Sequence, residues 1–265
     1  MKTKFILLFL LAIFTLLNNS ELKAQCDIDP NVEDCYDAGG SGAWTEATET
    51  IRLPDWNMLC PVTIDFCWRQ VSPPPNHQVQ LFIKKIHVPS NPECNGLRDY
   101  LNVNDDALAA HNANYLKQLV QNALTLNLFL YMWEHLTTQE EKNSYLCPGG
   151  PSGSDPNALH WRTKYFFEDG LCQAWCRVYQ PVGLDDDILL VPKACTEAEC
   201  CKITIRYCVT NPNTNPPTIM MVKTYDGQSA PSCHSIQTPY IECPAGVEVT
   251  YLSCKSNCQE LHLND

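Results

Sequence analysis

The stretch that decides the fold is CKITIRYC at residues 201–208, because CPVTIDFC at residues 60–67 has the same pattern. A first cysteine, a Thr-Ile pair and a last cysteine fall at matching places in both stretches. Between the cysteines, apolar residues alternate with polar ones in each copy. Alternation with a period of two, rich in β-branched residues, is typical of a half-buried strand. The sequence therefore predicts two related strands that lie far apart in the chain.

The likeness continues beyond the two strands. In both copies a proline-rich loop, an apolar run and a further cysteine follow, at 71–77, 78–86 and Cys94 in the first copy and at 211–217, 218–225 and Cys233 in the second. Prolines cannot continue a β-ladder, so they mark the tip of a hairpin. We interpret the pattern as an internal repeat of two related β-hairpins.

The N-terminus has the three parts of a secretory signal peptide. Lys2 and Lys4 form a basic start, an uncharged run covers 5–17, and a polar stretch ends at the small residue Ala24. This pattern predicts a signal peptide over residues 1–24 and a protein that is secreted or held in the cell envelope. The apolar run is shorter than the roughly 20 residues that span a bilayer, so a permanent transmembrane segment is not expected. Gln25 stands before Cys26 where a lipid-attachment signal needs a small residue, which leaves lipidation as the weaker interpretation.

All sixteen cysteines follow the predicted signal segment. An even, high number of cysteines in an exported chain predicts a framework of structural disulfides. Structural zinc is not expected, because it needs close-set cysteine pairs and Cys-x-x-Cys does not occur. The disulfide candidates are Cys26, Cys35, Cys60, Cys67, Cys94, Cys147, Cys172, Cys176, Cys195, Cys200, Cys201, Cys208, Cys233, Cys243, Cys254 and Cys258.

Strand geometry limits how the cysteines of the repeat can pair. Side chains alternate between the two faces of a strand, so Cys60 lies on the apolar face and Cys67 on the polar face. Seven residues of strand span about 23 Å, whereas the Cα atoms of a disulfide lie within about 7 Å. Each strand is therefore bonded to other parts of the chain at both ends. Cys200 has no counterpart in the first copy, and Cys195 is its nearest candidate partner.

Composition divides the chain after the signal segment into three parts. We predict a cysteine-rich β unit over 25–96, a helical insertion over 97–147 and a second cysteine-rich β unit over 148–265, with the two β units in one domain as an alternative. Asp105 and Asp106 suit the start of a helix. The segment 123–133 alternates like a strand, but its leucine content favours a helix buried against the sheet. The expected fold class is mainly β (α+β) and disulfide-rich, with two related hairpin units around a helical insertion.

Charge and acidic clusters give weaker indications. Without residues 1–24 the chain carries 15 basic and 29 acidic side chains, a net charge of −14. Such a charge disfavours nucleic acids as partners. No cofactor is expected, with calcium as the alternative, because oxygen-bearing side chains at alternate positions of 27–34 resemble half of a calcium loop. Val32 stands where that loop needs glycine, so a solvated acidic loop is the better interpretation there and at 185–187. The calcium candidates are Asp27, Asp29, Asn31 and Glu33.

Catalytic signatures are missing from the sequence. It contains neither a Gly-x-Ser-x-Gly elbow nor a His-Glu-x-x-His helix, and its seven histidines are scattered. We therefore predict a non-catalytic secreted protein with a structural, adhesive or binding role, whose partner is an extracellular protein or a glycan. Two alternatives remain. One is a secreted hydrolase whose site forms only in three dimensions, and the other is a subunit of an extracellular assembly that self-associates through hairpin edges or the segment 123–133.

Overall fold

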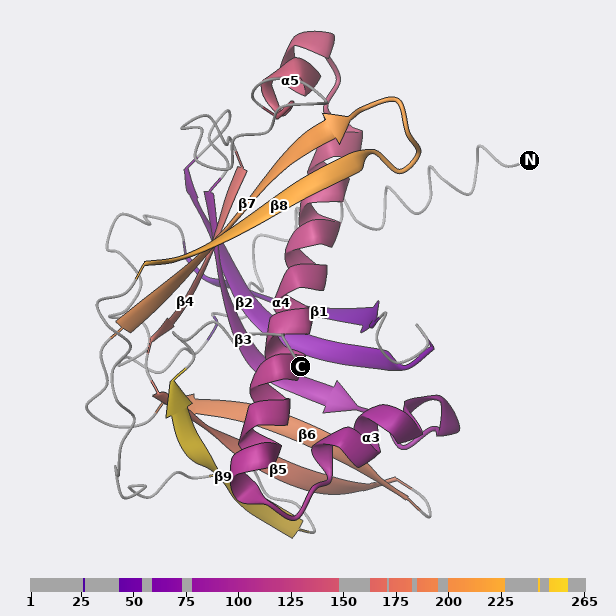
Figure 1. Ribbon diagram of the computed structural model, residues 1–265, viewed down its shortest axis with the longest axis vertical. Coiled ribbons are helices and arrows are strands. Elements are labelled where there is room, and N and C mark those ends of the chain that lie inside the picture. Colours follow the sequence, from indigo (N-terminus) through magenta and orange to yellow (C-terminus); the bar gives the residue numbers. More distant parts are fainter. Residues whose placement is uncertain are drawn as a thin grey trace.

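The computed structural model describes a mixed structure in which one long helix packs on a large sheet (Figure 1). The described residues are 26, 43–53, 59–72, 78–147, 163–170, 172–182, 185–194, 200–226, 243 and 248–256. The strands are β1 (Thr45–Arg52), β2 (Pro61–Ser72), β3 (Gln78–Val88), β4 (Thr163–Gly170), β5 (Cys172–Val182), β6 (Asp185–Ala194), β7 (Cys200–Asn211), β8 (Thr218–Asp226) and β9 (Glu248–Ser256). The helices are η2 (Pro92–Cys94), α3 (Asn95–Leu101), α4 (Asp106–His135) and α5 (Gln139–Ser144).

The nine strands form one sheet that branches at β3. β2 pairs with one edge of β3, and β1 pairs with β2. The other edge of β3 is shared, because β4 pairs with Gln78–Leu81 and β6 pairs with Ile86–Val88. One branch continues from β4 to β7 and β8, and the other continues from β6 to β5 and β9. The two predicted hairpins, β2–β3 and β7–β8, therefore share one sheet.

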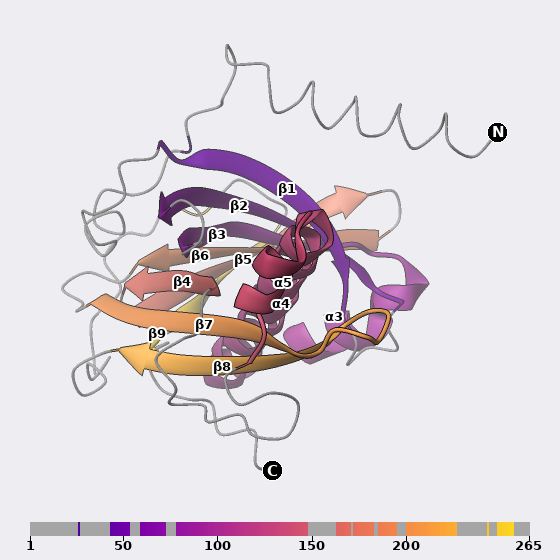
Figure 2. The same cartoon turned by 90° about the horizontal axis from the view of Figure 1, so that it is seen from above.

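Helix α4 lies along the concave side of this sheet. Seen along the helix, the strands from β1 to β8 curve around one side of it (Figure 2). The side chain of Asp105 caps the helix by accepting a hydrogen bond from the Leu108 amide at 2.8 Å. The segment 123–133 is helical, as predicted, because α4 runs without interruption to His135. Thr138 and Glu141 form the capping box that starts α5.

The main core lies between α4 and the apolar faces of both hairpins. Ile64 of β2 and Ile205 of β7 are fully buried in it, together with Val120 and Leu124 of α4. Cys60 lies in this core, whereas Cys67 lies on the opposite face of the sheet. The alternation in the sequence therefore assigned the two faces of these strands correctly.

Four disulfides join described residues, and three of them fasten the two hairpins to other parts of the chain. The four bonds are Cys26–Cys67, Cys60–Cys94, Cys147–Cys208 and Cys176–Cys243. Cys67 and Cys208 lie inside β2 and β7 and not, as the sequence predicted, at their ends, because the strands continue to Ser72 and Asn211. Each of the two strands is bonded to a distant segment rather than to itself, as strand length requires. None of the cysteines whose side chains are described is a free thiol. The bond considered between Cys195 and Cys200 lies outside the described residues, as do the pairings of Cys35, Cys172, Cys201, Cys233, Cys254 and Cys258.

The segment 163–180 differs from its simplest interpretation. The sequence favours two strands about a turn at Glu168-Asp169-Gly170, and two strands are present. They do not pair with each other, however, because β4 pairs with β3 and β7 while β5 pairs with β6 and β9. Gly170 is the last residue of β4 and lies opposite Cys200. The predicted turn residues are instead the end of β4, and the chain passes from one branch of the sheet to the other between Gly170 and Cys172.

Candidate functional site

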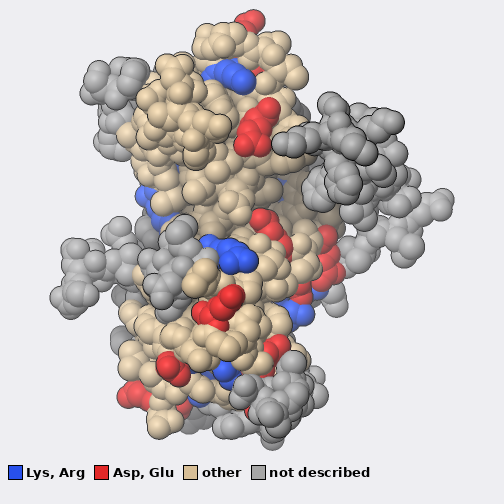
Figure 3. All heavy atoms as spheres, turned by 90° about the vertical axis from the view of Figure 1, so that its right-hand side faces the viewer, with Lys and Arg blue, Asp and Glu red and all other residues tan. Residues whose placement is uncertain are grey.

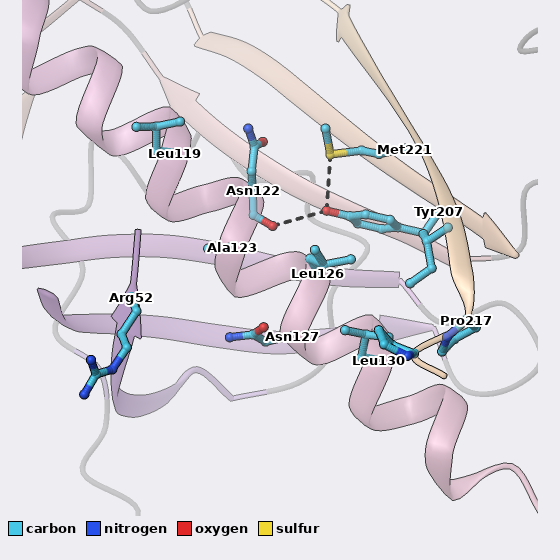
Figure 4. A pocket seen from close by; sticks show the side chains of 12 residues that line it. Arg52, Leu119, Asn122, Ala123, Leu126, Asn127, Leu130, Tyr207, Pro217 and Met221 are labelled. Carbon is cyan, nitrogen blue, oxygen red and sulfur yellow. Dashed lines mark hydrogen bonds between the residues drawn. The ribbon is translucent and has the colours of Figure 1, made fainter. Parts of the chain in front are cut away.

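A groove of about 670 Å³ lies between α4 and the β7–β8 hairpin (Figure 4). Helix α4 forms its floor, and β8 with the end of the hairpin loop forms one wall. The end of β1 contributes Arg52. The lining residues are Arg52, Leu119, Asn122, Ala123, Leu126, Asn127, Leu130, Tyr207, Pro216, Pro217, Ile219 and Met221.

The floor of the groove follows from residue spacing on α4. Its six lining residues begin at Leu119 and end at Leu130, at intervals of three and four that place them on one side of a helix. Ala123 stands in the middle of this row, and its methyl group leaves the space that a longer side chain would fill. Leu126 is 36% exposed, whereas Leu124 of the same helix is fully buried in the core. The groove is therefore an exposed strip of a helix whose other side packs in the core.

Tyr207 fixes the wall of the groove to its floor. Its hydroxyl lies 2.7 Å from the Thr125 hydroxyl, and its ring stacks on Phe129 at a centroid distance of 5.2 Å. The same hydroxyl donates to the Asn122 carbonyl oxygen and the Met221 sulfur, both at 3.4 Å (Figure 4). Burial raises the pKa of Tyr207 to about 12, although the hydrogen bond with Thr125 opposes that shift. The tyrosine therefore stays neutral and holds β7 against α4.

The rim of the groove has few charges. Arg52 is the one charged side chain among the described lining residues. Asn127 donates from Nδ2 to the Glu49 carboxylate at 3.1 Å, which ties α4 to β1 on that side. Lys223 follows Met221 on the same face of β8, and burial lowers its pKa to about 8. The groove thus offers apolar contact with few fixed polar groups.

A histidine–aspartate pair lies away from the groove, where β3 meets β6. His87 Nε2 is 2.6 Å from Asp187 Oδ2, and the Ser90 amide donates to Asp187 Oδ1 at 2.7 Å. Burial by itself raises the pKa of Asp187, but the hydrogen bonds from His87 and Ser90 outweigh it, and the pKa is lowered. Both carboxylate oxygens of Asp187 are hydrogen-bonded, one with His87 and one with the Ser90 amide. The main role of the pair is therefore to hold β6 against the outer edge of β3.

The calcium prediction concerns residues that the structure does not describe. Asp27, Asp29, Asn31 and Glu33 lie outside the described residues. In the second acidic cluster Asp187 is bound to His87, while the backbone carbonyl of Asp186 accepts from Arg98. Within the described ranges no three His, Cys, Asp or Glu side chains meet in a way that could hold a metal ion. Over the same ranges no helix has the length and apolar character needed to cross a membrane.

Comparison with protein-family models, curated proteins and solved structures found no match for this chain. The geometry of the groove and the chemistry of its lining therefore carry the functional argument.

The sequence did not single out the groove residues, although it contained one signal for them. Segment 123–133 has more leucines than one buried helix face needs, because they alternate as well as recur at helical spacing. Leu126 and Leu130 are the leucines beyond those of the buried face, and they line the groove. The contribution of Ile219 and Met221 was hidden, because only the folded hairpin brings them next to α4.

Proposed function

We propose that this protein is a disulfide-stabilised, non-catalytic binding protein that acts at the cell surface or outside the cell and holds an apolar partner in the groove. The observation that carries this proposal is the groove lining, in which eight of the twelve residues are apolar. Concave apolar surfaces that remain open to solvent usually mark binding sites. The small number of polar groups in the lining favours an apolar segment of a protein over a glycan.

The disulfides support the proposed location of the protein at the cell surface or outside the cell. Bonds such as Cys60–Cys94 and Cys147–Cys208 persist in oxidising compartments outside the cytoplasm. The signal segment predicted over residues 1–24 agrees with export.

The distribution of charge supports recognition by apolar contact. Figure 3 shows one side of the molecule, on which acidic and basic side chains are scattered instead of gathered into a patch of one sign. A protein that captures charged ligands usually concentrates charge of the opposite sign. Together with the lining of the groove, this distribution favours a partner that is recognised by its apolar surface.

A solvent-sensitive fluorescent dye with an apolar ring system and one sulfonate, 1-anilinonaphthalene-8-sulfonate, tests the proposal. The chain from Gln25 onward, with intact disulfides, is expected to enhance the dye's fluorescence with saturable binding. Leu126→Glu places a charge in the groove and should weaken dye binding at least 10-fold. Leu108→Glu is the matched control, because Leu108 lies on the same helix, is 47% exposed and does not line the groove. Equal loss in both variants, or no saturable binding, would contradict the proposal.

The second candidate function is a hydrolase, and the His87–Asp187 pair is the observation that favours it. A histidine oriented by a carboxylate is a recurrent base in hydrolytic sites. His87 is 30% exposed, so substrate could approach its ring. Hydrolysis of chromogenic esters or glycosides that disappears in His87→Ala, with folding retained, would support this candidate. The same rate in His87→Ala and in the unchanged chain would exclude a catalytic role for His87.

A further inference from the structure

Strand β8 has one edge that no described strand covers. Among the described strands β8 pairs with β7 alone, and it ends the series of strands in its branch. Aligning the hairpins on Cys67 and Cys208 makes β8 the counterpart of β3, since Cys67 lies opposite Phe82 and Cys208 lies opposite Met220. The outer edge of β3 is paired with β4 and β6. The matching edge of β8 presents backbone donors and acceptors for which a further strand is the natural partner.

The first five residues of β8 do not protect this edge, and the charged residues of the strand, Lys223 and Asp226, lie toward its far end. Residues 218–222 read Thr-Ile-Met-Met-Val and contain no charge. β1, another edge strand, carries Glu46, Glu49 and Arg52, and charged side chains on an edge oppose the addition of a strand. The side chains of the third edge strand, β9, lie outside the described residues. Among the edges that are described with side chains, β8 is therefore the one suited to accept a strand.

The groove adjoins this open edge. Ile219 and Met221 belong both to β8 and to the lining, and Met221 is 42% exposed. The floor from Leu119 to Leu130 spans about 16 Å at the rise of an α-helix. That length matches about five residues of a β-strand. A strand paired with β8 would therefore place alternate side chains over the apolar floor of the groove.

We propose that the strand is β8 of a second copy of this chain, paired antiparallel to form a two-fold symmetric dimer. This inference rests on the proposed binding role of the groove and names its partner. An antiparallel pair of identical strands is self-complementary, as a two-fold interface requires. An axis through Met221, perpendicular to the sheet, places Lys223 of each copy opposite Ile219 of the other. The two ammonium groups stay apart, and both apolar faces remain on the side of the grooves.

Net charge gives the association a recognisable salt dependence. Each copy without residues 1–24 carries a formal charge of −14, so two copies repel each other at low ionic strength. Salt screens this repulsion but does not weaken backbone pairing or apolar contact. The dimer is therefore expected to tighten as salt increases, whereas an association driven by ion pairs would loosen.

Sedimentation velocity of the chain from Gln25 onward, over a range of concentrations, tests the proposal. The unchanged chain should show a monomer–dimer equilibrium that shifts toward dimer with added salt. Met221→Lys places two like charges at the two-fold axis and should raise the dissociation constant at least 10-fold. Leu108→Lys introduces the same charge at an exposed site outside the groove and should leave it unchanged. Circular dichroism of both variants checks that they fold.

The outcomes separate this inference from the proposed function. A monomer at every concentration that still binds the dye through Leu126 would overturn the dimer and leave the binding role intact. A dimer that Met221→Lys does not weaken would place the contact elsewhere and also overturn the inference. Dye that binds the Met221→Lys monomer but is excluded from the dimer would support both proposals.

Discussion

The two hairpins of this protein have closely matched strands but different surroundings. Phe66 of β2 lies opposite Ile83, and Tyr207 of β7 lies opposite Met221 at the corresponding position. Ile83 is 1% exposed, whereas Met221 is 42% exposed. Ile83 lies in the main core, and β4 and β6 pair with β3 on either side of it, at Gln78–Leu81 and Ile86–Val88. No described strand pairs with the outer edge of β8. Similar local sequence can thus build a core in one place and a binding surface in another.

The largest expected effect comes from truncating the matched side chains. Ile83→Ala leaves a cavity in the core and should lower the free energy of unfolding by about 2–5 kcal/mol. Met221→Ala removes a partly exposed side chain and should lower it by less than about 1 kcal/mol. Urea denaturation at a protein concentration that keeps the chain monomeric measures both values. Equal losses would show that β8 is as well covered as β3.

Breaking the hydrogen bonds that link β3 to β6 is expected to have the next largest effect on the free energy of unfolding. Asp187→Ala removes the hydrogen bonds from His87 and Ser90 and should cost about 1–3 kcal/mol at pH 7. The pKa of Asp187 is lowered in the folded protein, so its contribution is present above about pH 4 and is lost as the pH falls further. The unchanged chain should therefore lose more stability than Asp187→Ala between pH 5 and pH 3. Asp186→Ala serves as the control, and an equal effect there would contradict a specific link.

Tyr207 distinguishes the second hairpin from the first, where Phe66 takes its place. Tyr207→Phe removes the hydrogen bond to Thr125 and should cost about 1 kcal/mol at neutral pH. Because burial raises the pKa of Tyr207 to about 12, its neutral form stabilises the fold fully below pH 10, and this contribution is lost toward pH 12. The variant should lose less stability between pH 9 and pH 11. Tyr131→Phe, at a 49% exposed site, should show neither change.

Replacing Lys223 is expected to have the smallest effect, and it should stabilise the fold, whereas the substitutions above destabilise it. It lies opposite Ile205, where the first hairpin has the buried Ile86 opposite Ile64. Burial lowers the pKa of Lys223 to about 8, so its charged form opposes folding at neutral pH. Lys223→Ile should stabilise the fold by about 0.5–1 kcal/mol at pH 7. The gain should shrink as the pH rises from 8 toward 10.5, and a gain that does not depend on pH would exclude this explanation.

Local patterns predicted the elements, and long-range pairing decided what they form. Alternation identified β2 and β7 and the faces of Cys60 and Cys67, because side-chain direction is fixed by the strand itself. The acidic start at Asp105 and the leucine content of 123–133 identified α4, because helix caps and helix propensity are also local properties. The parallel pairing of β4 with β3 was not visible, because it joins residues that are far apart in the chain. The groove was missed because it combines Ala123 of the helix with Met221 of the hairpin.

The central claim, that β8 has an open edge that accepts a second copy, is tested most directly by hydrogen exchange. Backbone amides of β3 and β8 are compared at low and high protein concentration. We predict that β3 is protected at both concentrations, while residues 218–223 exchange faster at low concentration and become protected when dimers form. Protection of β8 equal to that of β3 at the lowest concentration would contradict the claim, since its edge would then be covered in the monomer.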